Sequence, residues 1–159
     1  MRKTLLLFTT MAVALVLGAG MAWAAPGPPT VVSTVPPNGA TFVDPNANIK
    51  AKFSEAMKAR SINTSTFYLY QGHLIGGCPA GGCVSDPVAA TVRYNADTRT
   101  AILDPVSTLL FCTGYTAVVE GTGDGDMVAV KDRGGTPMAS DYIFYFSTDA
   151  GPGGGTCRP

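Results

Sequence analysis

The chain has 159 residues, enough for one domain with a single hydrophobic core. It carries 11 Lys and Arg against 11 Asp and Glu, so its formal net charge at pH 7 is zero, and it contains one His. A chain with this balance and no basic run lacks the positive stripe that nucleic-acid binding requires, so we expect no nucleic-acid partner.

The first 25 residues have the pattern of a secretory signal peptide. A short basic start is followed by an apolar run over 5–17 and by the sequence Ala-Trp-Ala. We expect cleavage after Ala24 or Ala25, which leaves an exported chain with nine basic and eleven acidic residues. A retained membrane anchor is the alternative, but the Pro-rich stretch that follows favours cleavage. After cleavage we expect no membrane span, because no later segment is long and apolar enough.

Short apolar runs and turns follow the leader. Residues 30–35 are rich in Val and Thr and end in Pro-Pro-Asn-Gly, which predicts an edge strand because Pro cannot donate to a sheet ladder. From Ile49 to Phe53 apolar residues alternate with Lys, which predicts a half-buried strand. The next residues favour a single helical turn capped by Ser54, with Met57 folded inward. Phe53 and Met57 are therefore predicted core residues.

More strands are predicted further along the chain. They cover residues 67–70, 88–94, 100–103, 115–119 and 142–148, and residues 127–130 favour a further small strand. With no long helical pattern, the seven main strands predict an all-β fold, an antiparallel Ig-like β-sandwich over 26–149. Residues 150–159 form a Gly-rich C-terminal tail.

Tyr115 opens one of these strands directly after a Gly turn. This position is typical of the tyrosine corner of Ig-like sandwiches, in which the hydroxyl bonds a backbone group upstream. The alternative is an ordinary strand Tyr.

Three segments resemble the bacterial Ig-like domains of the Big_5 (SbsA-type) family. They are Pro-Pro-Asn-Gly-Ala, Ile-Lys-Ala-Lys-Phe-Ser-Glu-Ala-Met and Ile-Asn-Thr-Ser-Thr-Phe, in this order. The resemblance spans residues 29–148 and implies a sandwich fold and a non-catalytic module of secreted or surface proteins, without identifying a ligand. Asp132 and Gly135 match the family's Asp-x-x-Gly turn, although Thr136 stands where the family often has Asn.

The four cysteines are Cys78, Cys83, Cys112 and Cys157. In an oxidising compartment an even count fits two disulfides. If successive strands alternate in direction, the loop with the first two, the loop with the third and the tail with the last all lie at one end of the sandwich. We favour the pairs 78–83 and 112–157, and the other pairings stay open. The second bridge would contribute about 3–4 kcal/mol by restricting the unfolded chain.

Two metal sites are weak candidates. His73 and the two Cys of its Gly-rich loop, with one more Cys, could bind zinc, but their spacing is looser than zinc sites usually have. Asp124, Asp126 and Asp132 could supply oxygen ligands for calcium, but they lack the EF-hand spacing. We therefore expect no metal and no cofactor.

Catalytic patterns are equally sparse. The sequence has no Gly-x-Ser-x-Gly nucleophile elbow, and Glu55 and Glu120 have no evident catalytic partner. We expect an exported, non-catalytic module with a structural or binding role in the periplasm or at the cell surface, where its partner is a protein or a glycan. The alternative is a small-ligand or glycan-binding accessory domain that uses Tyr68, Tyr70 and the Cys-rich loop. Exposed aromatic side chains clustered beside that loop would favour the alternative, and a bare polar surface would favour a scaffold.

Overall fold

The computed structural model describes residues 27–72, 87–123, 128–151 and 157. Within these ranges the helices and strands are eight β-strands and one turn of 3₁₀ helix, η1 (Ala59–Ser61). The strands are β1 (Val31–Val35), β2 (Ala40–Val43), β3 (Ile49–Phe53), β4 (Phe67–Gln71), β5 (Ala90–Asn95), β6 (Thr100–Pro105), β7 (Gly114–Val119) and β8 (Tyr142–Thr148).

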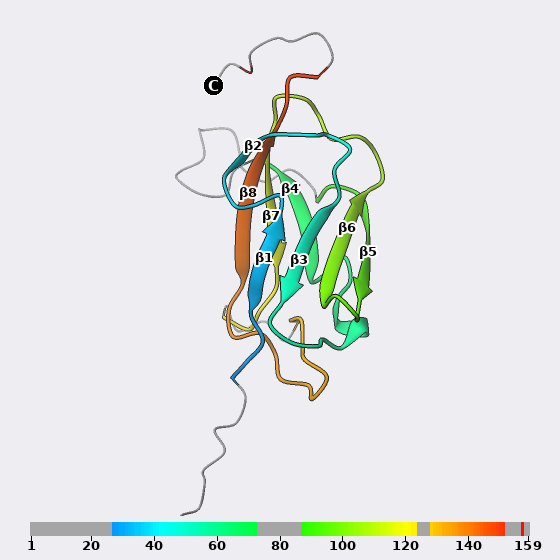
Figure 1. Cartoon of the computed structure of the whole chain (residues 1–159), viewed down its shortest axis with the longest axis vertical. Helices are drawn as coiled ribbons and strands as arrows, with labels where there is room; N and C mark the ends of the chain where they lie inside the picture. The colour runs from blue at the N-terminus through cyan, green and yellow to red at the C-terminus, as the bar shows by residue number, and fades with distance from the viewer. Residues whose placement is uncertain (1–26, 73–86, 124–127, 152–156, 158–159) are drawn as a thin grey trace, which may run out of the picture.

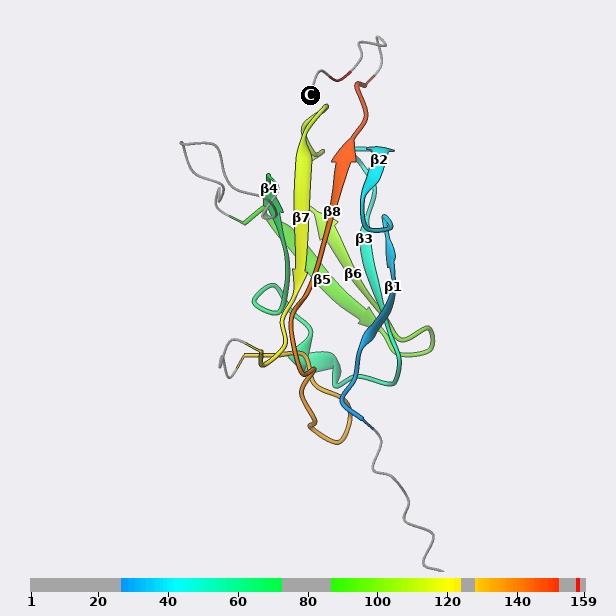
Figure 2. The same cartoon turned by 90° about the vertical axis from the view of Figure 1, so that its left-hand side faces the viewer.

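The strands form two four-stranded sheets that pack face to face as a sandwich (Figures 1 and 2). One sheet has the order β1-β3-β6-β5 and the other the order β2-β8-β7-β4. Neighbouring strands are antiparallel, except that β2 runs parallel to β8. β1 lies at the edge of its sheet, as the prolines after it predict. The predicted Ig-like β-sandwich is thereby confirmed.

The structure has one strand more than the seven predicted. β1 and β2 belong to opposite sheets, because the turn over 36–39 carries the chain across the sandwich. Phe42 has a φ of 58°, which interrupts the extended backbone of β2, so this strand lacks the alternation by which the others are recognised. The further small strand predicted over 127–130 does not form in its described part, residues 128–130, and Met127 lies outside the described residues.

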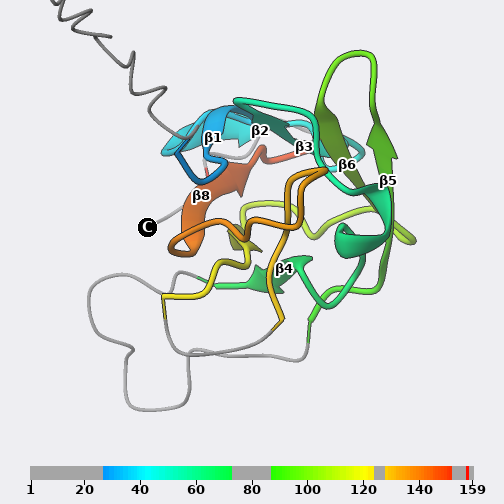
Figure 3. The same ribbon diagram turned by 90° about the horizontal axis from the view of Figure 1, so that it is seen from below.

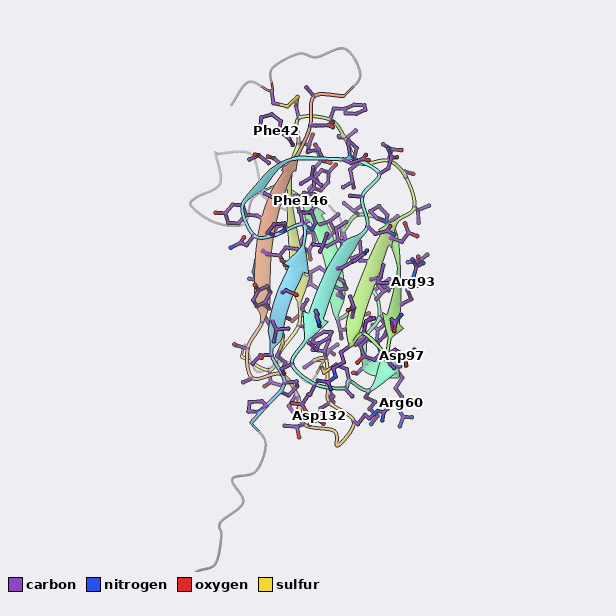
Figure 4. The ribbon with its side chains drawn as sticks, in the orientation of Figure 1. Phe42, Arg60, Arg93, Asp97, Asp132 and Phe146 are labelled. Carbon is purple, nitrogen blue, oxygen red and sulfur yellow. A yellow bond between two sulfur atoms is a disulfide. The ribbon has the colours of Figure 1, made fainter. Side chains whose placement is uncertain are left out.

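Inward-facing side chains of both sheets fill the space between them. In β3, Ile49, Ala51 and Phe53 are at most 1% exposed, whereas the two Lys residues between them face solvent. Phe53 and Met57 belong to the core, as predicted. The core also contains a set of large buried side chains from both sheets: Phe67, Leu69, Leu103, Tyr115, Val119, Phe144 and Phe146, the last of which is labelled in Figure 4.

At the lower end of the molecule in Figure 1, two turns far apart in the sequence are paired. Met57 and Asp132 form an isolated antiparallel bridge with backbone hydrogen bonds on both sides of it. Figure 3 shows the segment that precedes β8, in orange, crossing this end of the sandwich. The predicted helical turn after Ser54 is wrong: the 3₁₀ turn forms later, and the Ser54 hydroxyl oxygen instead accepts a hydrogen bond from the Thr30 N–H at 3.1 Å.

At the upper end, the loop between β6 and β7 is tied to both strands that follow it. The Tyr115 hydroxyl oxygen accepts a hydrogen bond from the Leu110 N–H at 2.8 Å, which confirms the predicted tyrosine corner. Its ring stacks on Phe146 with the centroids 5.7 Å apart. The Thr148 hydroxyl donates to the Leu110 carbonyl at 2.6 Å. The loop is therefore held by side chains of β7 and β8 together.

Candidate functional site

Three tyrosine side chains lie on the outer surface of the sheet that contains β7. Tyr68 and Tyr70 come from β4, and Tyr145 comes from β8 on the other side of β7. In register between them, β7 contributes Thr116 and Val118, which are 0% and 4% exposed although they face away from the core. The middle of the sheet is therefore covered on its outer side. We call this surface the tyrosine face.

The tyrosine face is held rigidly at Tyr68. Its hydroxyl donates a hydrogen bond to the Glu120 carboxylate, and its ring meets Tyr70 edge-on with the centroids 5.2 Å apart. Burial raises the pKa of Tyr68 well above its ordinary value, and the hydrogen bond to the Glu120 carboxylate raises it further. Ile143 of β8, 42% exposed, adds apolar surface on the other side of β7. The face thus combines aromatic and aliphatic surface with a carboxylate acceptor.

A hollow of about 370 Å³ opens between β4 and β5, the last strands of the two sheets on this side of the sandwich. Its wall includes Phe67, Tyr68, Val88, Ala90 and Leu103, so it is mainly apolar. Tyr68 belongs both to this edge hollow and to the tyrosine face. A volume in this range is typical of sites for small ligands, so the two features together form a candidate binding site.

Both ends of the Cys-rich segment lie next to Tyr70. Gly72 follows directly after β4, and its carbonyl accepts a hydrogen bond from the Thr116 hydroxyl at 2.7 Å. At the other end, Pro87 forms a bridge to Tyr70, and the Val88 N–H donates to the β4 backbone at 2.7 Å. The segment between these two anchors, residues 73–86, holds three predicted site residues that lie outside the described residues: His73, Cys78 and Cys83.

The other two cysteines form a disulfide at the upper end. Cys112 and Cys157 are joined with their Cα atoms 5.0 Å apart, which is the pairing that the strand directions favour. The Cys112 N–H also donates to the Asp149 carbonyl at 2.8 Å. The bridge therefore fixes the chain just after β8 against the loop that precedes β7.

The calcium candidate is only partly described. Asp124 and Asp126 lie outside the described residues. Loss of hydration acts to raise the pKa of Asp132. Hydrogen bonds from the backbone N–H groups of Thr136, Gly135 and Gly134 outweigh this effect and hold the pKa below its ordinary value. The Asp132 carboxylate thus serves to close its own turn. Among the described residues, no group of three or more His, Cys, Asp or Glu side chains is placed to hold a metal ion.

Sequence reasoning named Tyr68 and Tyr70 but missed Tyr145 and the edge hollow. The alternation of residues 142–148 already places Tyr145 on the face opposite Phe144 and Phe146, so its outward orientation could be predicted from the sequence. Its position near Tyr68 and Tyr70 could not be predicted, because it depends on the strand order. That order places β8 and β4 on either side of β7 and is set by contacts between residues far apart in the sequence.

Comparison with known families and proteins agrees with this architecture. The family model described as bacterial Ig-like domain, Big_5, matches residues 25–148. A search of curated proteins finds no match. Within the part of the chain that the structure describes, no helix is long and apolar enough to cross a membrane.

Solved structures with the same fold include two kinds of protein. PcoC, a methionine-rich copper resistance protein from Escherichia coli, is 19% identical with a TM-score of 0.54, and the match covers 77% of this chain and 99% of that one. The surface-layer protein SbsC is 17% identical with a TM-score of 0.50, and the match covers 77% of this chain but only 14% of that much longer one. At these identities the likeness concerns the fold.

Proposed function

The chain belongs to the bacterial Ig-like domain family, and we propose that it is an exported, non-catalytic module with a binding role at the cell envelope. Three observations support this proposal. The first 25 residues read as a secretory leader. The Cys112–Cys157 disulfide suits an oxidising compartment. A surface-layer protein is among the proteins of the same fold.

The tyrosine face beside the edge hollow carries the binding proposal. Sugar rings present apolar C–H faces and hydroxyl rims, and tyrosine rings match them with an apolar body and a polar tip. The Glu120 carboxylate, held by Tyr68, offers an acceptor for sugar hydroxyls. The Tyr68 and Tyr70 rings already pack against each other, so little conformational entropy of these two side chains is lost on binding. We therefore propose a glycan of the cell envelope as the partner.

A purely structural role is the second candidate. β1 begins at the lower end of the sandwich and β8 finishes at the upper end, so the described chain enters and leaves at opposite ends (Figure 1). The Cys112–Cys157 disulfide stabilises the end at which the chain leaves. This arrangement suits a spacer in an extended assembly, and such a spacer needs no ligand on its tyrosine face.

Retention on immobilised glycan from the native envelope separates the two roles. We expect the wild-type protein to be retained and the Tyr70→Ala, Tyr145→Ala double variant to bind about tenfold more weakly, the equivalent of two lost ring contacts. Ile102→Ala, on the outer surface of the opposite sheet, is the matched control and should bind normally. Equal retention of the double variant, with its fold intact by circular dichroism, would contradict the glycan proposal and favour the spacer.

A further inference from the structure

Two lysines are held side by side at the lower end of the sandwich. Residues 57 and 132 form the antiparallel bridge described above, so the next pair along it, Lys58 and Lys131, are directly opposite each other. The Lys58 N–H donates to the Lys131 carbonyl at 2.8 Å. Directly opposed residues present their side chains on the same face, and like charges in this arrangement repel. The backbone therefore maintains a local concentration of positive charge.

Arg60 and a polar rim complete a groove around the two lysines. The groove has a volume of about 320 Å³, and Lys58, Arg60 and Lys131 line it together with Ser61, Asn63 and Val128. We call it the basic groove. Figure 4 shows Arg60 projecting from this end of the molecule, and Arg60 is exposed. Among the described residues, the ion pair present is Arg93 with Asp104, so no described carboxylate neutralises these three cations.

Two described carboxylates on segments that adjoin the groove are engaged elsewhere. Asp132 follows Lys131, so in the bridge its side chain points to the opposite face, where its carboxylate accepts the Thr136 N–H at 2.7 Å. Glu120, whose backbone contacts the Thr66 wall of the groove, accepts the Tyr68 hydroxyl. Three cations therefore face one groove without a described counterion.

We propose that the basic groove is an anion-binding site for a polyanionic glycan, a sugar chain that carries sulfate, phosphate or carboxylate groups. Lys58 and Arg60 on one turn and Lys131 on the turn paired with it can each engage a different charged group of such a chain. Val128, 52% exposed, is the one large apolar side chain exposed in the described lining. An acidic protein partner would need a larger apolar centre for its interface. The site shares no lining residue with the tyrosine face and goes beyond the function proposed above.

Binding of dextran sulfate, with neutral dextran of the same length as the reference, tests the proposal. At low salt the wild-type protein should bind dextran sulfate and should not bind neutral dextran. Its affinity for dextran sulfate should fall as the salt concentration rises. The Lys58→Ala, Lys131→Ala double variant should bind about tenfold more weakly, with the salt slope reduced by about one for each lysine removed. Lys58→Arg, Lys131→Arg should keep the binding. The matched control is Lys50→Ala, Lys52→Ala, which removes the same charge from the exposed face of β3 and should bind normally.

Three results would overturn the proposal. In the first, the β3 control loses as much affinity as the groove variant, which means that binding follows net charge. In the second, vesicles containing phosphatidylglycerol or a polyglutamate peptide bind as tightly as dextran sulfate. In the third, Asp124→Asn, Asp126→Asn weakens binding, which means that carboxylates and a bridging cation hold the polymer. The tyrosine variants leave the basic groove unchanged, so their result on envelope glycan does not affect the dextran sulfate test. The two proposals can therefore be refuted independently.

Discussion

Phe53 shows how one side chain supports both its own sheet and the turn that follows its strand. It is the last residue of β3, it is 1% exposed, and its ring meets Tyr94 of β5 edge-on with the centroids 6.4 Å apart. The Tyr94 hydroxyl oxygen in turn accepts the Met57 N–H at 2.9 Å. A single core ring therefore supports both the sheet and the turn that follows it.

Replacing Phe53 by Ala should cost about 3–5 kcal/mol of unfolding free energy, because it removes apolar contacts and leaves a cavity. This is a large share of the roughly 5–15 kcal/mol that holds a typical domain together. Urea unfolding followed by circular dichroism measures the change, with Lys52→Ala as the exposed neighbour for control. An unchanged midpoint for Phe53→Ala would show that this position is not in the core.

The Asp132 carboxylate predicts how the stability of the protein depends on pH. Its pKa in the folded protein lies below the ordinary value, so the charged form stabilises the fold at pH values above the unfolded pKa of about 4. That contribution is lost as the pH falls through the folded pKa. Asp132→Asn should therefore be less stable than the wild type at pH 7, and the difference should shrink below about pH 4. A stability difference that does not change with pH would rule out the carboxylate charge as its source.

At this scale local patterns predict burial well and contacts poorly. Phe53 was identified because strand alternation depends only on neighbouring residues. Met57 was placed in the core by the turn predicted after Ser54, and it is buried although that turn is not helical. Ser54 was misassigned because its hydrogen-bond partner, the Thr30 N–H, belongs to the segment just before β1, 24 residues earlier. Tyr145 was missed for the same kind of reason: its place on the tyrosine face depends on which strands become neighbours.

Among the elements, the alternation of strand directions had the most predictive value. It placed the loop with Cys112 and the tail with Cys157 at one end, and the structure joins them. β2 escaped prediction because its pairing with β8 is parallel and its backbone is interrupted at Phe42. Long-range pairing, rather than local propensity, defines that strand.

The Cys112–Cys157 disulfide should act mainly on the unfolded chain, which it restricts over a separation of 45 residues. The Cys112→Ser, Cys157→Ser variant should therefore keep the same circular dichroism spectrum and lose about 3–4 kcal/mol of stability under oxidising conditions. Wild-type protein treated with a reductant is the control and should unfold near the variant. Equal stability of the variant and the oxidised wild type would contradict the bracing role.

The paired turns at the lower end explain why two separated motifs occur together. The Phe-Ser-Glu-Ala-Met segment and the Asp-x-x-Gly turn meet in the Met57–Asp132 bridge, and Ser61 reinforces the contact by accepting the Lys131 N–H at 3.0 Å. The sequence resemblance pointed to both motifs, but the contact between them, and the basic groove that it creates, appear only in three dimensions.

As a whole, the molecule is a sandwich with chemically different surfaces. The tyrosine face lies on one sheet, and the edge hollow opens between the two sheets. The basic groove lies at the lower end, and the disulfide closes the upper end. An Ig-like fold leaves such surfaces free to vary while the core stays fixed. The fold class could therefore be predicted from strand pattern and family resemblance, whereas the surfaces depend on strand order and register.

The central claim is that the tyrosine face binds an envelope glycan, and chemical-shift mapping of the isotope-labelled protein with isolated envelope polysaccharide tests it most directly. We predict saturable shifts of the ring signals of Tyr68, Tyr70 and Tyr145, with the Ile102 methyl signals on the opposite sheet unchanged. Saturable shifts confined to other surfaces, or no shifts at concentrations at which the protein is retained on the same polysaccharide, would contradict the claim.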